Sequence, residues 1–233
     1  MAAAGSRMEF AMDKKKLSQD DLRKSLALYA VTDRQWLKEG ETLADKVAQA
    51  IEGGATFIQL REKSMDRDAF EKEALKIKEV CASYHVPFVL DDDVELAVKI
   101  DCDGVHVGQE DMEAGRVREL IGPDKILGVS AKTVDQALLA QSRGADYLGV
   151  GAVFSTSTKP GAIGCDLKTI GEITKAVDIP CIAIGGVNES NIDQLTGHGL
   201  YGVAVVSAIF AQDDVKKAAA SLLERTRKAL DLS

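Results

Sequence analysis

One short run of the sequence, Gln59-Leu60-Arg61-Glu62-Lys63, places two cations and an amide at alternate positions. Alternate side chains of an extended segment point to the same side, so Gln59, Arg61 and Lys63 are expected to face one way. Leu60 and Glu62 would face the other. An arginine can hold two phosphate oxygens at once, and a lysine adds a compact charge. The run is typical of a diphosphate site, although a solvated, charged strand end would have the same composition.

Two acidic stretches, Asp91-Asp92-Asp93 and Gly108-Gln-Glu-Asp111, could supply ligands for a metal ion. Carboxylates from two loops, completed by phosphate oxygens and water, are the usual surroundings of Mg²⁺ in proteins. Asp93 is better interpreted as a helix N-cap, because a helical pattern begins there. Asp92 and Asp111 are therefore the predicted Mg²⁺ ligands.

Two further features allow either a functional or a structural interpretation. The stretch Thr156-Ser157-Thr158-Lys159, followed by a glycine-containing segment that ends at Gly164, could close over an anion, or it could be an ordinary surface loop. His106 lies within an apolar run and is either a core histidine or a residue that lines the site.

Eight short apolar runs, alternating with longer segments of helical period, must position these residues. This order predicts a parallel sheet with helices outside it, and eight parallel strands predict a closed (βα)8 barrel of the α/β class. The expected strands are Leu26 to Val31, Thr56 to Leu60, Pro87 to Leu90, Gly104 to Val107, Ile126 to Val129, Tyr147 to Val150, Cys181 to Ile184 and Gly202 to Val206. The expected helices lie near 42–52, 67–84, 93–99, 113–121, 133–142, 167–177, 189–197 and 213–229.

Active sites of such barrels lie at the C-terminal ends of the strands, which is where most of these polar residues fall. The loops after the seventh and eighth strands commonly bind phosphate through backbone amides and a helix N-terminus. Here those loops carry Gly186, Val206 and Ser207. We therefore expect a second, phosphate-binding part of the site at this point.

The composition is that of one compact, soluble domain of 233 residues, with 45% hydrophobic residues. We expect residues 1–20 to be an N-terminal extension, its first eight residues resembling an added tag, and 21–233 to be the catalytic barrel.

The net charge of −8 disfavours nucleic acid and anionic membranes as partners. Four cysteines without paired spacing, together with the lack of a signal peptide or an apolar span, predict a cytoplasmic protein with reduced thiols.

Seven motifs in this order resemble the thiamine-phosphate synthase family over essentially the whole barrel. They are QLREK at 59–63, DDD at 91–93, GVHVGQED at 104–111, GVSA at 128–131, TSTK at 156–159, IGG at 184–186 and VVSAI at 205–209. The glycine motif and the last motif are common among barrels, whereas the combination of the QLREK, HVGQED and TSTK motifs is highly specific.

The resemblance implies a magnesium-dependent transferase of thiamine biosynthesis that joins a pyrimidine diphosphate to a thiazole phosphate. It implies that the pyrimidine diphosphate is held by Gln59, Leu60, Arg61, Glu62, Lys63, Asp91, Ser130 and Lys159. It implies that the thiazole phosphate is held by Thr156, Ser157, Thr158, Gly186, Val206 and Ser207. One Mg²⁺ per subunit would be bound by Asp92 and Asp111. The implied catalytic groups are Arg61, Lys63, Ser130 and Lys159.

One position departs from the family pattern, which usually has Asn where this chain has Asp91. A carboxylate near a diphosphate should repel it unless Asp91 is protonated, turned away or drawn onto the metal.

The implied reaction is substitution at the pyrimidine methylene, with the thiazole nitrogen attacking and no protein nucleophile. Cations and Mg²⁺ would take up the charge of the leaving diphosphate.

Two rival hypotheses remain open at this stage. A related barrel that only isomerises a thiazole phosphate would need neither the Arg61 and Lys63 pair nor the two metal aspartates, and Asp91 alone gives it some support. A non-catalytic sensor would bind both ligands without forming a product. The oligomeric state is left open, and a homo-oligomer is allowed.

Overall fold

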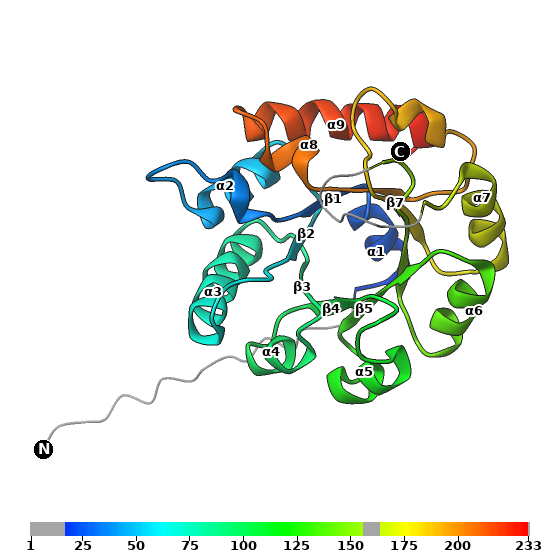
Figure 1. Ribbon diagram of the computed structural model, residues 1–233, viewed down its shortest axis with the longest axis horizontal. Helices are drawn as coiled ribbons and strands as arrows, with labels where there is room; N and C mark the ends of the chain where they lie inside the picture. The colour runs from blue at the N-terminus through cyan, green and yellow to red at the C-terminus, as the bar shows by residue number, and fades with distance from the viewer. Residues whose placement is uncertain (1–16, 156–163, 233) are drawn as a thin grey trace, which may run out of the picture.

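The computed structural model describes residues 17–155 and 164–232, and in this part the chain forms one closed barrel of eight parallel strands in sequence order (Figure 1). The predicted (βα)8 barrel is thus confirmed, and each predicted apolar run overlaps one strand. The strands are β1 Leu28–Val31, β2 Phe57–Leu60, β3 Phe88–Asp91, β4 Gly104–Val107, β5 Ile126–Ala131, β6 Tyr147–Gly151, β7 Cys181–Ile184 and β8 Gly202–Val205.

Helices surround the strands as an outer ring (Figure 1). The main helices of this ring are α2 Leu43–Glu52, α3 Arg67–Ser83, α4 Val94–Lys99, α5 Ala114–Ile121, α6 Val134–Ser142, α7 Leu167–Ala176 and α9 Val215–Leu230. The shorter elements are α1 Gln19–Ser25, α8 Ser207–Phe210 and the 3₁₀ turns η1 Arg34–Trp36 and η2 Ile192–Leu195. The expected N-cap Thr133 accepts a hydrogen bond from the amide of Gln136 at 3.2 Å, which satisfies a free donor at the start of α6.

Two apolar layers hold the barrel together. An outer layer packs the strands against the ring helices and contains Leu60, Val105 and Val150. An inner layer fills the barrel and includes Tyr29, Phe57 and other strand side chains. The rings of Tyr29 and Phe57 stack with centroids 4.6 Å apart. Strand side chains alternate between these two layers, which is why several predicted runs are apolar throughout.

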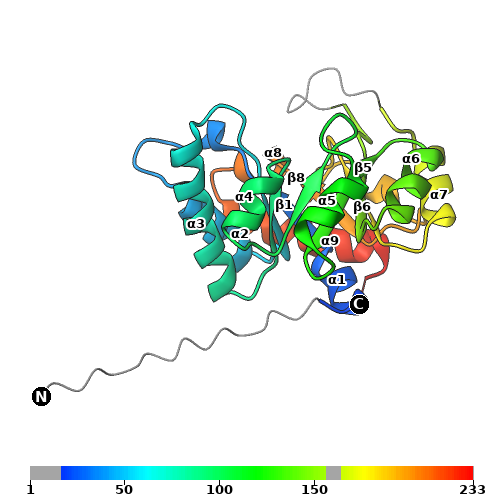
Figure 2. The same ribbon diagram turned by 90° about the horizontal axis from the view of Figure 1, so that it is seen from below.

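Helix α1, which the sequence analysis did not predict, lies under the end of the barrel at which the strands begin (Figure 2). Its start is capped by Ser18, whose hydroxyl accepts from the amide of Asp21 at 3.1 Å. Leu22 of α1 and Leu26 just after it belong to the inner layer. The helix therefore closes the barrel at the end opposite the strand ends that carry the polar residues.

The helix predicted at 189–197 is wrong, because the structure forms only the short 3₁₀ turn η2 there. Local side chains satisfy the backbone instead. Asn191 accepts from the amide of Asn188 at 2.9 Å, and Asn188 accepts from the amide of Ser190 at 2.8 Å. Such side-chain bonds compete with the helical hydrogen bonds of the backbone.

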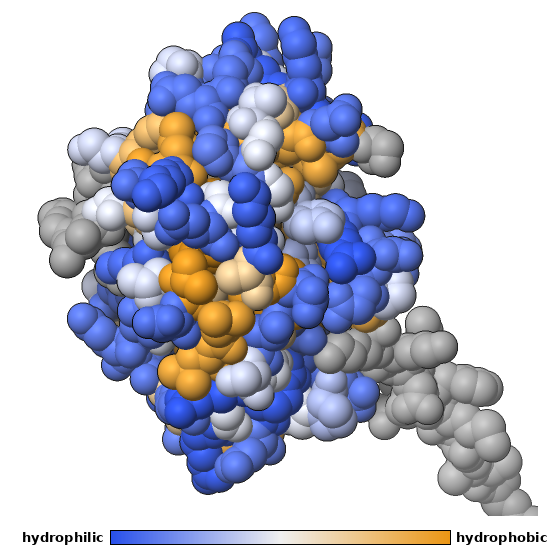
Figure 3. All heavy atoms as spheres, turned by 90° about the vertical axis from the view of Figure 1, so that its right-hand side faces the viewer, coloured by the Kyte–Doolittle hydropathy of each residue, from blue (hydrophilic) through white to orange (hydrophobic). Residues whose placement is uncertain are grey.

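The side of the molecule on which α6 and α7 lie is mostly hydrophilic and carries several apolar patches (Figure 3). Leu138 and Leu139 of α6 are among the exposed apolar side chains, with 43% and 48% of their surface accessible. Within the described parts of the chain, no helix combines the length and the apolar character that a membrane span requires.

Candidate active site

The residues after β2 bring two cations to the C-terminal end of the barrel. Gln59, within β2, is buried, and Arg61 and Lys63 follow the strand. The Arg61 amide donates to the Thr32 hydroxyl at 3.1 Å, which ties this segment to the end of β1. Arg61 Nε and Lys63 Nζ lie 3.7 and 3.4 Å from Asp91 Oδ2. The structure therefore gathers Gln59, Arg61 and Lys63 around one carboxylate.

Leu60 and Glu62 lie apart from this group. Leu60 belongs to the outer apolar layer. The Glu62 carboxylate accepts from the amides of Lys63 and Ser64 at 2.8 and 2.9 Å. Burial by itself would raise the pKa of Glu62, but the amide hydrogen bonds outweigh burial and lower the pKa below its ordinary value. Both residues thus hold the segment in shape rather than facing Asp91.

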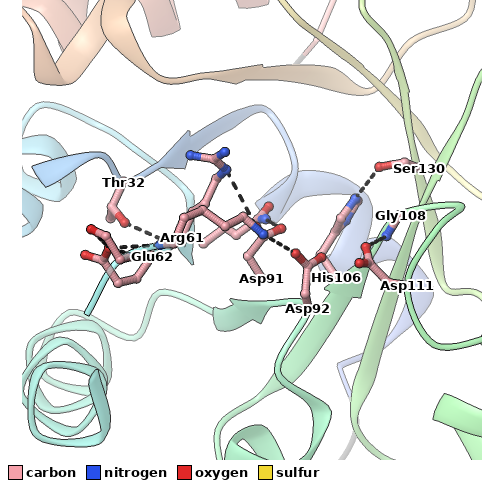
Figure 4. A network of polar contacts seen from close by, with 12 residues as sticks. Thr32, Arg61, Glu62, Asp91, Asp92, His106, Gly108, Asp111 and Ser130 are labelled. Carbon is pink, nitrogen blue, oxygen red and sulfur yellow. Dashed lines mark hydrogen bonds and ion pairs between the residues drawn. The ribbon is translucent and has the colours of Figure 1, made fainter. Parts of the chain in front are cut away.

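A left-handed turn after β3 directs two consecutive carboxylates toward the same cation. Asp92 has φ = 62°, a conformation that Asp tolerates better than most residues. In a continuing strand, Asp91 and Asp92 would point to opposite sides. Here Lys63 Nζ lies near Asp91 and donates a hydrogen bond to Asp92 Oδ2 (Figure 4). The next residue, Asp93, caps α4 through the amide of Leu96 at 2.9 Å, as predicted.

The predicted metal ligands Asp92 and Asp111 meet across the ends of β3 and β4 (Figure 4). Burial, the charge of Asp91 and a side-chain hydrogen bond with Asp111 raise the pKa of Asp92 to about 6, against the opposing effect of Lys63. Asp111 Oδ2 also accepts from the amide of Gly108 at 2.8 Å. Two carboxylates in contact repel each other when both are charged, and a divalent cation would relieve that repulsion.

This donor set suits Mg²⁺. In residues 17–155 and 164–232, no group of three or more His, Cys, Asp or Glu side chains is arranged to hold a metal ion. Mg²⁺ typically needs only one or two carboxylates, because water and substrate phosphates complete its octahedron. The Asp92 and Asp111 pair therefore fits a magnesium ion that is held together with a phosphorylated substrate, rather than one enclosed by protein alone.

A chain of hydrogen bonds crosses the barrel interior from Asp91 to the end of β5. Its members, in order, are Asp91, Gln59, Tyr29, Tyr147, His106 and Ser130. The successive distances are 2.5, 2.7, 2.8, 3.0 and 3.0 Å. His106 is 5% exposed, so it is a buried histidine, and it also touches a predicted site residue through Ser130. The burial agrees with a core histidine, whereas a role of His106 in lining the site stays a prediction.

Gly128 of β5 makes the middle of this chain possible. A Cβ atom at this position would lie 2.3 Å from the Tyr147 hydroxyl and 2.5 Å from His106 Nδ1. Any other residue would therefore separate these two side chains. At the far end, Gln109 donates to the Ser130 carbonyl at 2.6 Å. The position of Ser130 is thus fixed through both its side chain and its backbone.

The loops after β7 and β8 carry the residues predicted for the second, phosphate-binding part of the site. Gly186 has φ = 70°, and its carbonyl accepts from the side-chain Nδ2 groups of Asn188 and Asn191 at 3.1 and 2.9 Å. Helix α8 begins at Ser207, after the N-cap residue Val206, and no side chain caps it among the described residues. Its first amides thus follow the C-terminal end of β8 without a side-chain acceptor. This arrangement matches the recurrent phosphate site of (βα)8 barrels.

Comparison with known proteins identifies the family. The family model described as thiamine monophosphate synthase matches residues 28–209. The chain belongs to the thiamine monophosphate synthase family. Thiamine-phosphate synthases of Ruminiclostridium cellulolyticum and Clostridium tetani are 49% and 47% identical to it, over 84% of this chain and 93% of each relative. A solved structure titled thiamine phosphate pyrophosphorylase from Pyrococcus furiosus has a TM-score of 0.81 and 37% identity, covering 90% of this chain and 99% of that one.

Part of the site expected for a thiamine monophosphate synthase lies outside the described residues. This part comprises Thr156, Ser157, Thr158 and Lys159. The remaining expected residues fall into two groups. One group surrounds Asp91 and Asp92, and the other lies at Gly186 and Ser207. The roles assigned to both groups remain predictions.

Sequence reasoning missed four residues that position this site in the thiamine monophosphate synthase fold. Tyr29 and Tyr147 lie within apolar strands, where an aromatic residue is typical of the core. Thr32 follows the first apolar run and Gln109 lies in the HVGQED motif, so a polar residue at a strand end was an available signal for both. No such signal existed for the tyrosines, because their hydroxyl partners come from distant parts of the sequence.

Proposed function

We propose that this chain is a thiamine-phosphate synthase, which joins an aminopyrimidine carrying a diphosphooxymethyl group to a thiazole phosphate and releases diphosphate. One observation carries the proposal. Arg61 and Lys63 meet Asp91 and Asp92 at the ends of neighbouring strands, so that cations and hard oxygen ligands share one place at the barrel mouth. This combination suits a diphosphate accompanied by a divalent metal.

The reaction breaks the bond between the pyrimidine methylene carbon and a diphosphate oxygen, and it forms a bond from that carbon to the thiazole nitrogen. Negative charge accumulates on the leaving diphosphate. The Arg61 guanidinium and the Lys63 ammonium would hold this charge, and Lys159 would add to them. Fixed cations that meet charge developing in the transition state are among the strongest contributors to catalysis.

Asp92 and Asp111 would hold Mg²⁺, for which their contact is suited. The bound ion would supply further positive charge to the diphosphate. In the unliganded chain, Lys63 pairs with Asp92. A cation held by Asp92 would leave Lys63 available to contact the diphosphate, so the same lysine would serve with and without the metal.

The thiazole phosphate would bind at Gly186 and at the start of α8. At Gly186 the main chain packs closely against the backbone of Phe154 and Ser155, because glycine has no side chain. The amides at Ser207 carry no side-chain cap. Thr156, Ser157 and Thr158 are the further groups proposed for this substrate. This division places the two phosphorylated groups on opposite sides of the barrel mouth, with the reacting carbon and nitrogen between them.

The test is to incubate purified protein with both substrates and Mg²⁺, with a parallel sample containing EDTA. Thiamine phosphate and diphosphate should appear in equal amounts, and only in the presence of metal. An altered thiazole phosphate with the diphosphate ester intact would support the isomerase instead. Binding of both substrates with no product after long incubation would support the sensor.

The metal ligands are tested separately by substitution. Asp111→Asn keeps the size of the side chain but removes its charge, so the Mg²⁺ concentration for half-maximal rate should rise about tenfold or more. Glu110→Gln is the matched control, because Glu110 is an exposed neighbour in the same motif. An equal metal requirement in both variants would remove Asp111 from the metal site. A cytoplasmic location remains part of this proposal, which allows a homo-oligomer without requiring one.

A further inference from the structure

The hydrogen-bond chain from Asp91 to Ser130 has a direction, and Asp91 sets it. Arg61 and Lys63 lie against Asp91 Oδ2 and Gln59 Nε2 donates to Asp91 Oδ1, so Asp91 accepts on both oxygens and the NH₂ group of the Gln59 amide faces it. The Gln59 carbonyl oxygen then faces Tyr29 and accepts its hydroxyl hydrogen at 2.7 Å. The orientation of an amide is fixed here by chemistry, because its partner has no hydrogen to give.

The direction passes on through the two tyrosines. The single hydroxyl hydrogen of Tyr29 is used on Gln59, so in the contact between the hydroxyls Tyr147 must be the donor, at 2.8 Å. The Tyr147 hydrogen is then used as well. The bond of 3.0 Å between Tyr147 and His106 must therefore be donated by His106 Nδ1.

The last step concerns Ser130. A neutral imidazole that carries its hydrogen on Nδ1 has only a lone pair on Nε2. The Ser130 hydroxyl, 3.0 Å away, must then donate to His106. In the described part of the polypeptide, Arg23 Nε is the single buried side-chain nitrogen or oxygen without a hydrogen-bond partner. Arg23 does not belong to the series from Asp91 to Ser130, so every buried polar side-chain atom of that series has a partner.

We propose that Asp91 is a positioning residue that acts through three intermediate side chains, Gln59, Tyr29 and Tyr147, to hold His106 as the Nδ1–H tautomer. In the unliganded protein, Ser130 then meets an incoming substrate with its oxygen lone pairs outward and its hydrogen directed at His106. An Asn at position 91 would not hold this direction, because its oxygen would face Arg61 and Lys63 and its NH₂ group would then face Gln59. The inference concerns the site of the proposed function and extends its account of Ser130.

The tautomer can be measured directly by ¹⁵N NMR of protein labelled at histidine, with His106→Gln used to assign the signals among the three histidines. We expect a protonated Nδ1 and an unprotonated Nε2, with an excess over the other tautomer of about tenfold, the factor that one net hydrogen bond supplies. In Asp91→Asn this excess should fall to about threefold or less or should reverse, because the Asn NH₂ group would face Gln59. The control Asp93→Asn makes the same change at the α4 cap and should leave the His106 signals unchanged.

A double variant tests whether the effect travels through the chain. Tyr29→Phe keeps the ring that stacks on Phe57 but removes the hydroxyl between Gln59 and Tyr147. In this background, Asp91→Asn should produce no further change in the tautomer ratio. An undiminished effect would mean that Asp91 acts through its charge alone, and the proposal would be wrong.

Two results in the unaltered protein would also overturn the inference. They are a protonated Nε2 with an unprotonated Nδ1, and a fully protonated imidazolium ring. All of these spectra are recorded without substrate, on folded protein. A failure to form thiamine phosphate would therefore reject the proposed function while leaving the tautomer result intact, and the reverse also holds.

Discussion

Replacing Gly186 by alanine should damage both stability and phosphate binding, and Gly197 provides a matched control. Both glycines have positive φ, 70° and 79°. A left-handed conformation costs an L-residue roughly 1–2 kcal/mol. At Gly197 a new Cβ would have no heavy atom within 4 Å, whereas at Gly186 it would lie 2.5 Å from the Ser155 carbonyl oxygen and 2.9 Å from a Phe154 backbone carbon.

The difference between the two variants isolates the close contact. Forcing an extra methyl group against packed backbone costs typically 1–3 kcal/mol. Gly197→Ala should therefore lower the free energy of unfolding by about 1 kcal/mol, and Gly186→Ala by about 2–4 kcal/mol. Urea unfolding followed by circular dichroism measures both values, provided that the slope of the transition is the same in the two variants.

The same pair of variants separates stability from binding. The shift needed to relieve the contact moves the loop after β7, so Gly186→Ala should raise KM for the thiazole phosphate by about tenfold, equivalent to about 1.4 kcal/mol. KM for the pyrimidine diphosphate should change little, and Gly197→Ala should alter neither value. Equal losses of stability in both variants, or an unchanged thiazole KM in Gly186→Ala, would refute this reasoning.

Two further predictions concern buried groups away from the substrates. Arg118 pairs with the buried Asp146, so Arg118→Ala should lower the free energy of unfolding by about 3–5 kcal/mol in urea titrations. The control Arg116→Ala breaks an exposed pair with Glu119 and should change the free energy of unfolding by less than about 0.5 kcal/mol. Burial raises the pKa of Cys102 to about 11 and that of Cys181 to about 12, so both thiols stay protonated at pH 8. A disulfide reagent should therefore label them only after unfolding, and rapid labelling of native protein would contradict this.

The barrel could be predicted because its signal is local. Each strand is a short apolar run, and each loop at its end carries polar residues whose types already indicate their chemistry. The acidic turn illustrates the limit of this approach. Asp92 and Asp111 could be selected as metal ligands from composition and position, but the left-handed turn that directs Asp91 and Asp92 to the same lysine is not visible in the residue types.

The interior of the barrel was harder to predict, because its polar contacts join residues far apart in the sequence. Tyr29 and Tyr147 are 118 positions apart, and in an apolar strand each is indistinguishable from a core aromatic. The consequence of Asp91 depended on the same contacts. Its charge predicted repulsion of a diphosphate, whereas the structure gives it Gln59 as a donor and two cations as neighbours.

The most direct test of the central claim, that the cations after β2 take up the charge of the leaving diphosphate, is the turnover of Arg61→Ala compared with Arg67→Ala. Arg67 is an exposed arginine of α3 that pairs with Asp93 and Glu95, so it shares the substitution but not the site. We predict that Arg61→Ala loses about 10²–10³-fold in kcat with an unchanged melting temperature, and that Arg67→Ala keeps its activity. A fully active, folded Arg61→Ala enzyme would contradict the account.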